Sequence, residues 1–148
     1  MNKTINDLEQ ITTVSTSDEL PIYSEGETKK VTVGQLRDIK DVYSTEETLT
    51  NKVWIDGKPI YRKVVDCGAL PNNTLKTVAH NIANIGFVIN LYGIASDGSE
   101  RLPLPASYYS NSAVGLSVDG TNISLRPYSN RTTYTTTYIT IEYTKSTD

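Results

Sequence analysis

Two Asp-Gly pairs, each set between runs in which apolar and other residues alternate, constrain the fold of this chain more than any other feature. In Val114–Leu125 (VGLSVDGTNISL), apolar side chains occupy every second position on each side of Asp119-Gly120. A similar arrangement surrounds Asp56-Gly57 in Val53–Tyr61 (VWIDGKPIY). Alternation with a period of two is typical of strands with one buried face, and Asp-Gly between two such runs is a strong hairpin signal. The sequence therefore predicts an antiparallel hairpin with a two-residue turn at both places.

The chain after residue 53 contains more runs of this kind. They occur at Ile60–Cys67, Leu75–His80, Gly86–Ser96 and Thr133–Lys145. Gly86–Ser96 is the most apolar of them and is expected at the centre of a sheet, whereas Thr140 and Glu142 are expected to face water. Short strands that alternate with turns at regular spacing are typical of antiparallel sandwiches. We predict a mainly β protein in which residues 53–148 form an antiparallel, jelly-roll-like β-sandwich head.

The first 43 residues read as a separate, smaller unit. A strand is predicted at Glu19–Ser24, a turn around Gly26, and a second strand at Lys30–Val33. Apolar residues then fall three apart, which predicts a short helix over Gln35–Val42. So small a unit cannot bury its own apolar side chains, so it needs a partner surface. We expect an N-terminal docking arm (1–43), a polar linker (44–52) and the head (53–148).

Composition and charge exclude several classes of protein. The formal net charge is -3, so the chain lacks the basic field that nucleic acid binding needs. No apolar run approaches the roughly 20 residues that cross a bilayer, and the first residues lack the apolar stretch of a signal peptide. With one Cys and one His, neither a disulfide framework nor a site built from several Cys or His ligands is possible. We therefore expect no nucleic acid, membrane, metal or cofactor partner.

Candidate catalytic residues do not form a recognisable constellation. Cys67 and His80 lie on either side of a turn, and the pattern supplies no third group to orient them. The carboxylates Asp56, Asp97 and Asp119 each precede a glycine, a position typical of turns. No phosphate-binding glycine loop is present. The sequence predicts that the protein is not an enzyme.

Two groups of aromatic and polar residues remain as candidate interaction sites. Trp54 and Tyr61, on the first hairpin, are either anchors of a subunit interface or a platform for a ligand. The second group lies in two Tyr-, Asn- and Arg-containing loops and could bind glycan, because rings stack on sugars while amides and guanidinium groups bond their hydroxyls. Its members are Tyr108, Tyr109, Arg126, Tyr128 and Arg131. Solvation or a subunit contact explains the same loop composition.

Two segments resemble modules of tailed-bacteriophage structural proteins. The first resembles the short arm that opens tail-fibre and appendage proteins, with Thr-Thr, D-x-L-P-I, a glycine turn and TKKVTV before a leucine. The matching residues are Thr12, Thr13, Asp18, Leu20, Pro21, Ile22, Gly26, Thr28, Lys29, Lys30, Val31, Thr32, Val33 and Leu36. The second resembles the start of a β-sandwich module of phage and prophage proteins. Its hairpin, GALPN turn and IEYTK strand correspond to Trp54–Lys63, Gly68–Asn72 and Ile141–Lys145.

This resemblance implies a virion protein, made in the cytoplasm of a bacterial host, that is commonly a homotrimer. Its arm would dock on another virion protein, a portal, tail or capsid component. The implied docking residues are Leu20, Ile22, Val31, Val33 and Leu36. Two functions remain open: a short tail or head fibre whose head binds a host surface glycan, and a purely architectural capsid or tail decoration protein. Almost no shaft separates arm from head, which favours a short appendage over a long fibre.

Overall fold

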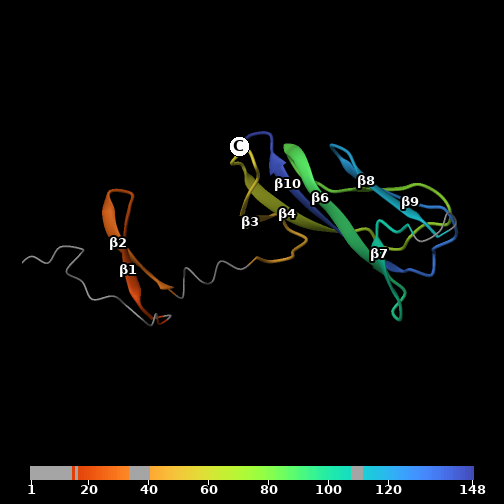
Figure 1. Ribbon diagram of the computed structural model, residues 1–148, viewed down its shortest axis with the longest axis horizontal. Coiled ribbons are helices and arrows are strands. Elements are labelled where there is room, and N and C mark those ends of the chain that lie inside the picture. Colours follow the sequence, from red (N-terminus) through yellow and green to blue (C-terminus); the bar gives the residue numbers. More distant parts are fainter. Residues whose placement is uncertain (1–14, 16, 34–40, 108–111) are drawn as a thin grey trace, which may run out of the picture. The chain divides into compact units, whose positions relative to one another are not determined.

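The computed structural model describes residues 15, 17–33, 41–107 and 112–148; the elements bounded there are β-strands, and Val33 alone is helical. The chain divides into two compact units, Met1–Lys40 and Asp41–Asp148 (Figure 1). We call them the arm and the head. The protein is therefore mainly β, with antiparallel pairing throughout its sheets, as the sequence predicts.

The described part of the arm is a two-stranded hairpin of β1 (Glu19–Ser24) and β2 (Glu27–Thr32). Its turn residues, Glu25 and Gly26, both have positive φ values, the conformation of the type I′ turn whose twist matches that of the strands. The predicted first strand is confirmed. The second begins three residues earlier than predicted, because this turn needs only two residues. Most of the predicted helix lies at residues 34–40, outside the described residues, and Asp41 and Val42 are not helical.

The head contains a five-stranded and a three-stranded antiparallel sheet. The strand order of the larger sheet is β3-β4-β10-β6-β7, and that of the smaller is β5-β9-β8. The larger sheet is built from β3 (Thr48–Val53), β4 (Pro59–Asp66), β10 (Thr136–Lys145), β6 (Ile85–Ser96) and β7 (Arg101–Leu104). The smaller sheet is built from β5 (Lys76–Ala79), β9 (Asn122–Pro127) and β8 (Val114–Val118).

Both sheets contribute side chains to one hydrophobic core. Ile139 and Ile141 of β10, together with Ile123 and Leu125 of β9, are completely buried in it. In Figure 1 β8 and β9, two strands of the smaller sheet, run beside β6. The third of the five strands, β10, is the middle strand of the larger sheet and pairs with β4 on one side and β6 on the other. The strand β6, which matches Gly86–Ser96, is interior to the sheet as the sequence predicts, between β10 and β7, but it is not the middle strand.

Two further predictions need correction. The predicted linker 44–52 contains most of β3, which pairs with β4. This edge strand has a polar sequence, TLTNKV, and buries only Thr50, so it lacks the apolar alternation that reveals a strand. Thr140 and Glu142, expected to face water, are both buried, because the face of β10 that carries them is covered as well.

The two Asp-Gly hairpins differ in their turns. Strands β8 and β9 form the predicted hairpin, and the Asp119 carboxylate accepts the N–H groups of Thr121 and Asn122. At Asp56-Gly57 the loop has three residues, because the Trp54 N–H donates to the Lys58 carbonyl. Gly57 has φ 85°, which fits the left-handed position that closes a three-residue hairpin loop. The predicted two-residue turn is therefore wrong at this hairpin.

Candidate functional site

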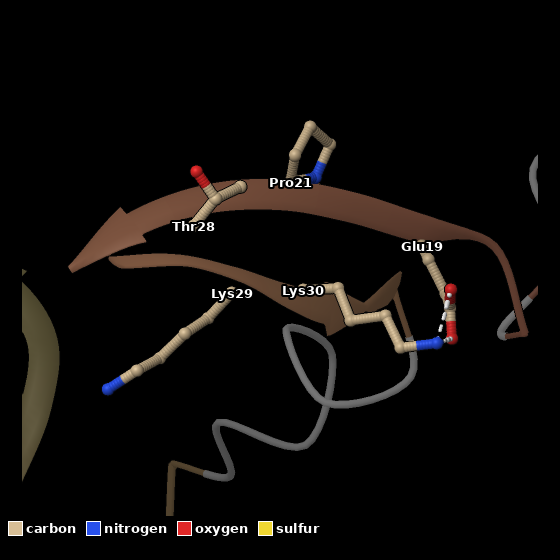
Figure 2. A pocket seen from close by; sticks show the side chains of 5 residues that line it. All are labelled: Glu19, Pro21, Thr28, Lys29 and Lys30. Atoms are coloured by element: carbon tan, nitrogen blue, oxygen red, sulfur yellow. Dashed lines mark hydrogen bonds and ion pairs between the residues drawn. The ribbon is translucent and has the colours of Figure 1, made fainter. Parts of the chain in front are cut away.

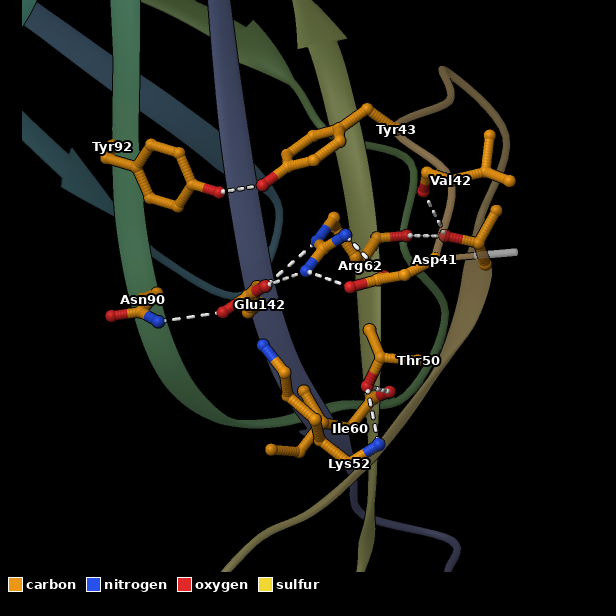
Figure 3. Close-up of polar contacts among 11 residues, drawn as sticks. Asp41, Val42, Tyr43, Thr50, Lys52, Ile60, Arg62, Asn90, Tyr92 and Glu142 are labelled. Atoms are coloured by element: carbon orange, nitrogen blue, oxygen red, sulfur yellow. Dashed lines mark hydrogen bonds and ion pairs between the residues drawn. The ribbon is translucent and has the colours of Figure 1, made fainter. Parts of the chain in front are cut away.

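A buried cluster of charges lies on the face of the larger sheet that points away from the core; we call this the outer face. Neighbours along a strand point to opposite faces, so Arg62, Glu142 and Asn90, which are register partners on β4, β10 and β6, share it. The Arg62 side chain is only 2% exposed. Its Nε and Nη2 atoms lie 2.8 and 2.6 Å from Glu142 Oε1, and Asn90 Nδ2 donates to Oε2 at 2.7 Å. One row of polar groups thus connects three strands (Figure 3).

The segment Asp41–Ser44, which we call the strap, closes over this cluster. Arg62 Nη1 donates to Asp41 Oδ1 at 2.6 Å, and the Tyr43 ring lies over the guanidinium group with its centroid 4.3 Å from Cζ. The Tyr43 hydroxyl lies 3.1 Å from that of Tyr92 on β6. The carbonyl of Ser44 accepts the backbone N–H of Val64 at 2.8 Å. Figure 3 shows Asp41 and Tyr43 on either side of the Arg62 head group.

The charges of this cluster balance one another. Burial by itself would raise the pKa of Glu142, but hydrogen bonds from Asn90 and Arg62 and the Arg62 charge outweigh burial and hold that pKa below its ordinary value. The positive charge of Lys52 acts in the same direction. The positive charges of Arg62 and Lys52 therefore offset the negative charges of Glu142 and Asp41. Both oxygens of Glu142 already accept hydrogen bonds, so this arrangement suits structural fixation and not proton transfer.

Trp54 directly follows β3, in the hairpin that β3 forms with β4. Its ring stacks on that of Phe87, with ring centroids 5.7 Å apart. Tyr61, the other candidate residue on this hairpin, stacks on a different ring. Tyr61 is the register partner of Tyr143 and stacks on it at the core side of the sheet, with ring centroids 6.1 Å apart. The tryptophan therefore pairs with β6, a contact between distant segments that local alternation does not indicate.

Exposed apolar side chains occur at this ring pair and next to Trp54 in the chain. Ile55 at the hairpin tip is 90% exposed, and Val53 and Phe87 are also exposed. We call Val53, Trp54, Ile55 and Phe87 the hairpin patch. Exposed apolar side chains that gather at one place are typical of interaction surfaces. Phe87, the only phenylalanine of the chain, was missed as an interaction residue because it occurs in the most apolar run, where burial is the ordinary expectation.

The predicted docking residues of the arm are only partly described. Leu20 is the register partner of Val31, and these two residues share one face of the hairpin; Leu20 is 47% exposed. Val33 follows β2 and is half-buried. Ile22 lies in β1 opposite Lys29, but the structure does not describe its side chain. Leu36 lies outside the described residues.

The β1–β2 hairpin of the arm carries an open depression of about 340 Å³ (Figure 2). It is lined by Glu19, Pro21, Thr28, Lys29 and Lys30. Lys30 and Glu19 form an exposed ion pair across it, with Nζ and Oε1 2.7 Å apart. Two strands alone cannot enclose a ligand, so this depression offers a surface and not a binding cavity.

The predicted glycan-binding loops are partly described as well. Arg126 and Tyr128 are exposed, whereas Tyr108 and Tyr109 lie outside the described residues. Arg131 is half-buried and donates through Nη2 to the carbonyl of Ser112 at 3.1 Å. Its guanidinium group therefore holds two loop segments together, which leaves fewer of its N–H groups for a ligand.

Cys67 and His80, the candidate catalytic pair, are both buried and have structural contacts. Burial raises the pKa of the Cys67 thiol to about 11, so little thiolate forms at neutral pH. His80 Nδ1 accepts the N–H of Ile82 at 3.1 Å, and Nε2 lies 3.2 Å from the Asp119 carbonyl. Nothing in the described part of the chain indicates an enzyme.

Within residues 15, 17–33, 41–107 and 112–148, no three His, Cys, Asp or Glu side chains are grouped so that they could hold a metal ion. The same residues contain no helix long and apolar enough to span a membrane. No protein-family model, curated protein or solved structure matches the chain.

Proposed function

We propose that this protein is a structural component of a bacteriophage particle, a short head or tail appendage that docks through its arm and displays its head. The observation that carries the proposal is the state of the arm. Its two-stranded hairpin has no second layer among the described residues, and Leu20 remains 47% exposed. A hairpin of this size is marginal in water by itself, so its apolar face calls for a partner surface. The resemblance of this segment to phage docking arms makes another virion protein, a portal, tail or capsid component, that partner.

The head is proposed to be a jelly-roll-like β-sandwich. Its two antiparallel sheets share one core, which is the arrangement that sandwich domains use. Such a head is rigid and can be displayed on the surface of a particle without support from the arm.

Docking through the arm predicts a selective defect. Leu20→Asp combined with Val33→Asp places two charges on apolar positions of the arm and none in the head. We expect the melting transition of the head to be unchanged, while the protein disappears from purified particles. Tyr23→Asp is the matched control, because Tyr23 is the partner of Thr28 on the other face of the hairpin and is already exposed. Incorporation of the double variant at the normal copy number would contradict docking through this face.

The hairpin patch is proposed to be the contact between subunits of a homotrimer, with Trp54 as its anchor. Truncation of a buried interface tryptophan typically costs at least ~2 kcal/mol, which weakens association about thirty-fold. We therefore expect Trp54→Ala to dissociate at markedly higher protein concentration than the wild type in sedimentation experiments. Tyr128→Ala, which removes an exposed ring outside the patch, should leave the dissociation unchanged. A wild-type protein that is monomeric, or equal dissociation of Trp54→Ala and wild type, would contradict this assignment.

The architectural version of this function has more support than glycan recognition. Arg131, one of the proposed glycan ligands, is engaged with Ser112, and the hairpin patch is apolar and suited to protein contacts. Glycan recognition rests on Arg126 and Tyr128, which are exposed and carry the hydrogen-bonding and stacking groups that sugars require.

A further inference from the structure

We propose that the strap, Asp41–Ser44, is a mechanical latch that passes tension on the N-terminal segment to the middle of the larger sheet. The proposal rests on the proposed function only in that a docked arm would be the source of the tension. The latch itself is a property of the head. Without it, a pull on the N-terminal segment would reach the sheet first at the edge strand β3.

Strand β3 is poorly suited to resist such a pull. Its register with β4 consists of the pairs Thr48↔Arg62, Leu49↔Tyr61 and Val53↔Pro59, with an irregularity between the last two. Most of the strand is exposed, and Thr50 is its one buried side chain. A force that lifts the start of β3 away from the sheet would load these pairings one after another. Strands at sheet edges with few buried contacts belong to the least stable parts of a fold.

The strap directs the force elsewhere. Asp41, the first residue of the head, is bonded to Arg62 of β4, and Arg62 is bonded to Glu142 of the central strand. Asn90 of β6 extends the row from Glu142 (Figure 3). A pull on Asp41 is therefore shared by three strands before it reaches Thr48. Charge-assisted hydrogen bonds of this kind are about twice as strong as neutral ones.

Opening of the strap would break several contacts at once. Removal of Asp41 leaves a buried guanidinium group with one carboxylate partner in place of two, which is costly in a site with little water. The same movement separates the Tyr43 ring from Arg62 and the Ser44 carbonyl from the Val64 N–H. Because these contacts lie within four residues of the chain, we expect them to open together and not one by one.

Optical-tweezers extension of the full chain, held by tags at its two termini, tests the latch. In the wild type, the strap and β3 should stay attached until the head itself unfolds. In Asp41→Ala, a separate early step is expected, in which residues 41–53 are released; fully extended they span at most about 45 Å. The opening rate of this step under a fixed load should exceed that of the wild type by about tenfold or more. Glu46→Ala, which removes an exposed carboxylate from the same segment, should behave as the wild type.

Hydrogen exchange at the Val64 amide gives a second, force-free measurement, because this N–H donates to the Ser44 carbonyl. Asp41→Ala and Tyr43→Leu should each accelerate its exchange about tenfold or more, while Glu46→Ala should not. Asp41→Asn, which keeps the shape of the side chain, replaces Asp41→Ala if the alanine variant does not fold. An early step in the wild type, or equal opening rates in the wild type and the Asp41 variant, would overturn the latch. Neither measurement involves a particle, so a failure of arm docking would leave both results unaffected.

Discussion

A head that begins at Asp41 is expected to melt in one cooperative transition, whereas a head that begins at Trp54 is expected to remain folded at room temperature but to melt at a much lower temperature. The shorter fragment lacks β3 and the strap, and with them the Asp41 partner of Arg62. It also lacks Glu47, whose carboxylate accepts the Tyr143 hydroxyl and pairs with Lys145, each at 2.5 Å. Loss of a partner from a fully buried ion pair costs about 3–5 kcal/mol, and loss of the half-exposed Asp41 costs less. Together with the loss of β3 and of both Glu47 contacts, this is a large part of the stability of a typical domain, about 5–15 kcal/mol.

Thermal melting followed by circular dichroism compares the two fragments directly. A third fragment that begins at Thr45 separates the contributions, because it keeps β3 and Glu47 but loses the strap. We expect its stability to lie between those of the other two. If the fragment that begins at Trp54 melts within a few degrees of the one that begins at Asp41, the strap and β3 are not part of the folding unit. The head would then begin at residue 53, as the sequence predicts.

The second large effect is expected at Glu142. Glu142→Gln keeps the size of the side chain but leaves the Arg62 charge buried with only the half-exposed Asp41 as its anionic partner. We expect a loss of about 3 kcal/mol or more in the free energy of unfolding, measured by urea titration. Glu46→Gln, at an exposed position, should change it by no more than about 0.5 kcal/mol. A change at Glu142 as small as that at Glu46 would show that the buried pair contributes little.

The same residue predicts a pH dependence. The pKa of Glu142 is lower in the folded protein than its ordinary value of 4.5, so its ionised form favours folding. The stabilisation is fully present above pH 4.5 and is lost as the pH falls through the lowered pKa. Unfolding measured between neutral pH and pH 3 should therefore show a steeper acid loss in the wild type than in Glu142→Gln. Parallel profiles would contradict this assignment.

The sequence predicts the fold best where one face of a strand is buried and the turn is local. The hairpin around Asp119 is of this kind, and the strand Glu19–Ser24 was recognisable from its local turn although its described side chains are exposed. Prediction fails where burial comes from distant segments. Ile139 to Thr144 are buried on both faces of β10, and no local pattern distinguishes the charge at Glu142 from one that faces water.

The candidate site was harder to predict than the fold. Trp54 was identified, but its partner Phe87 lies on another strand and could be found only once the register of the sheet was known. The Arg62 cluster was missed because its members are spread over residues 41–142 and none is unusual by itself. The one available signal was an arginine and a glutamate, each within a strand that is otherwise largely apolar or threonine-rich.

The central position of β10 has a consequence for how the protein is made. The strand β10 pairs with both β4 and β6. These two strands are synthesised before β10, so they lack the strand between them while they leave the ribosome. The larger sheet can close only after Thr136–Lys145 has emerged, so closure of this sheet waits for the last strand of the head. Until then the apolar faces of β4 and β6 are available to chaperones. A chain that terminates early lacks the strand around which the sheet is assembled, and is left as a substrate for proteolysis.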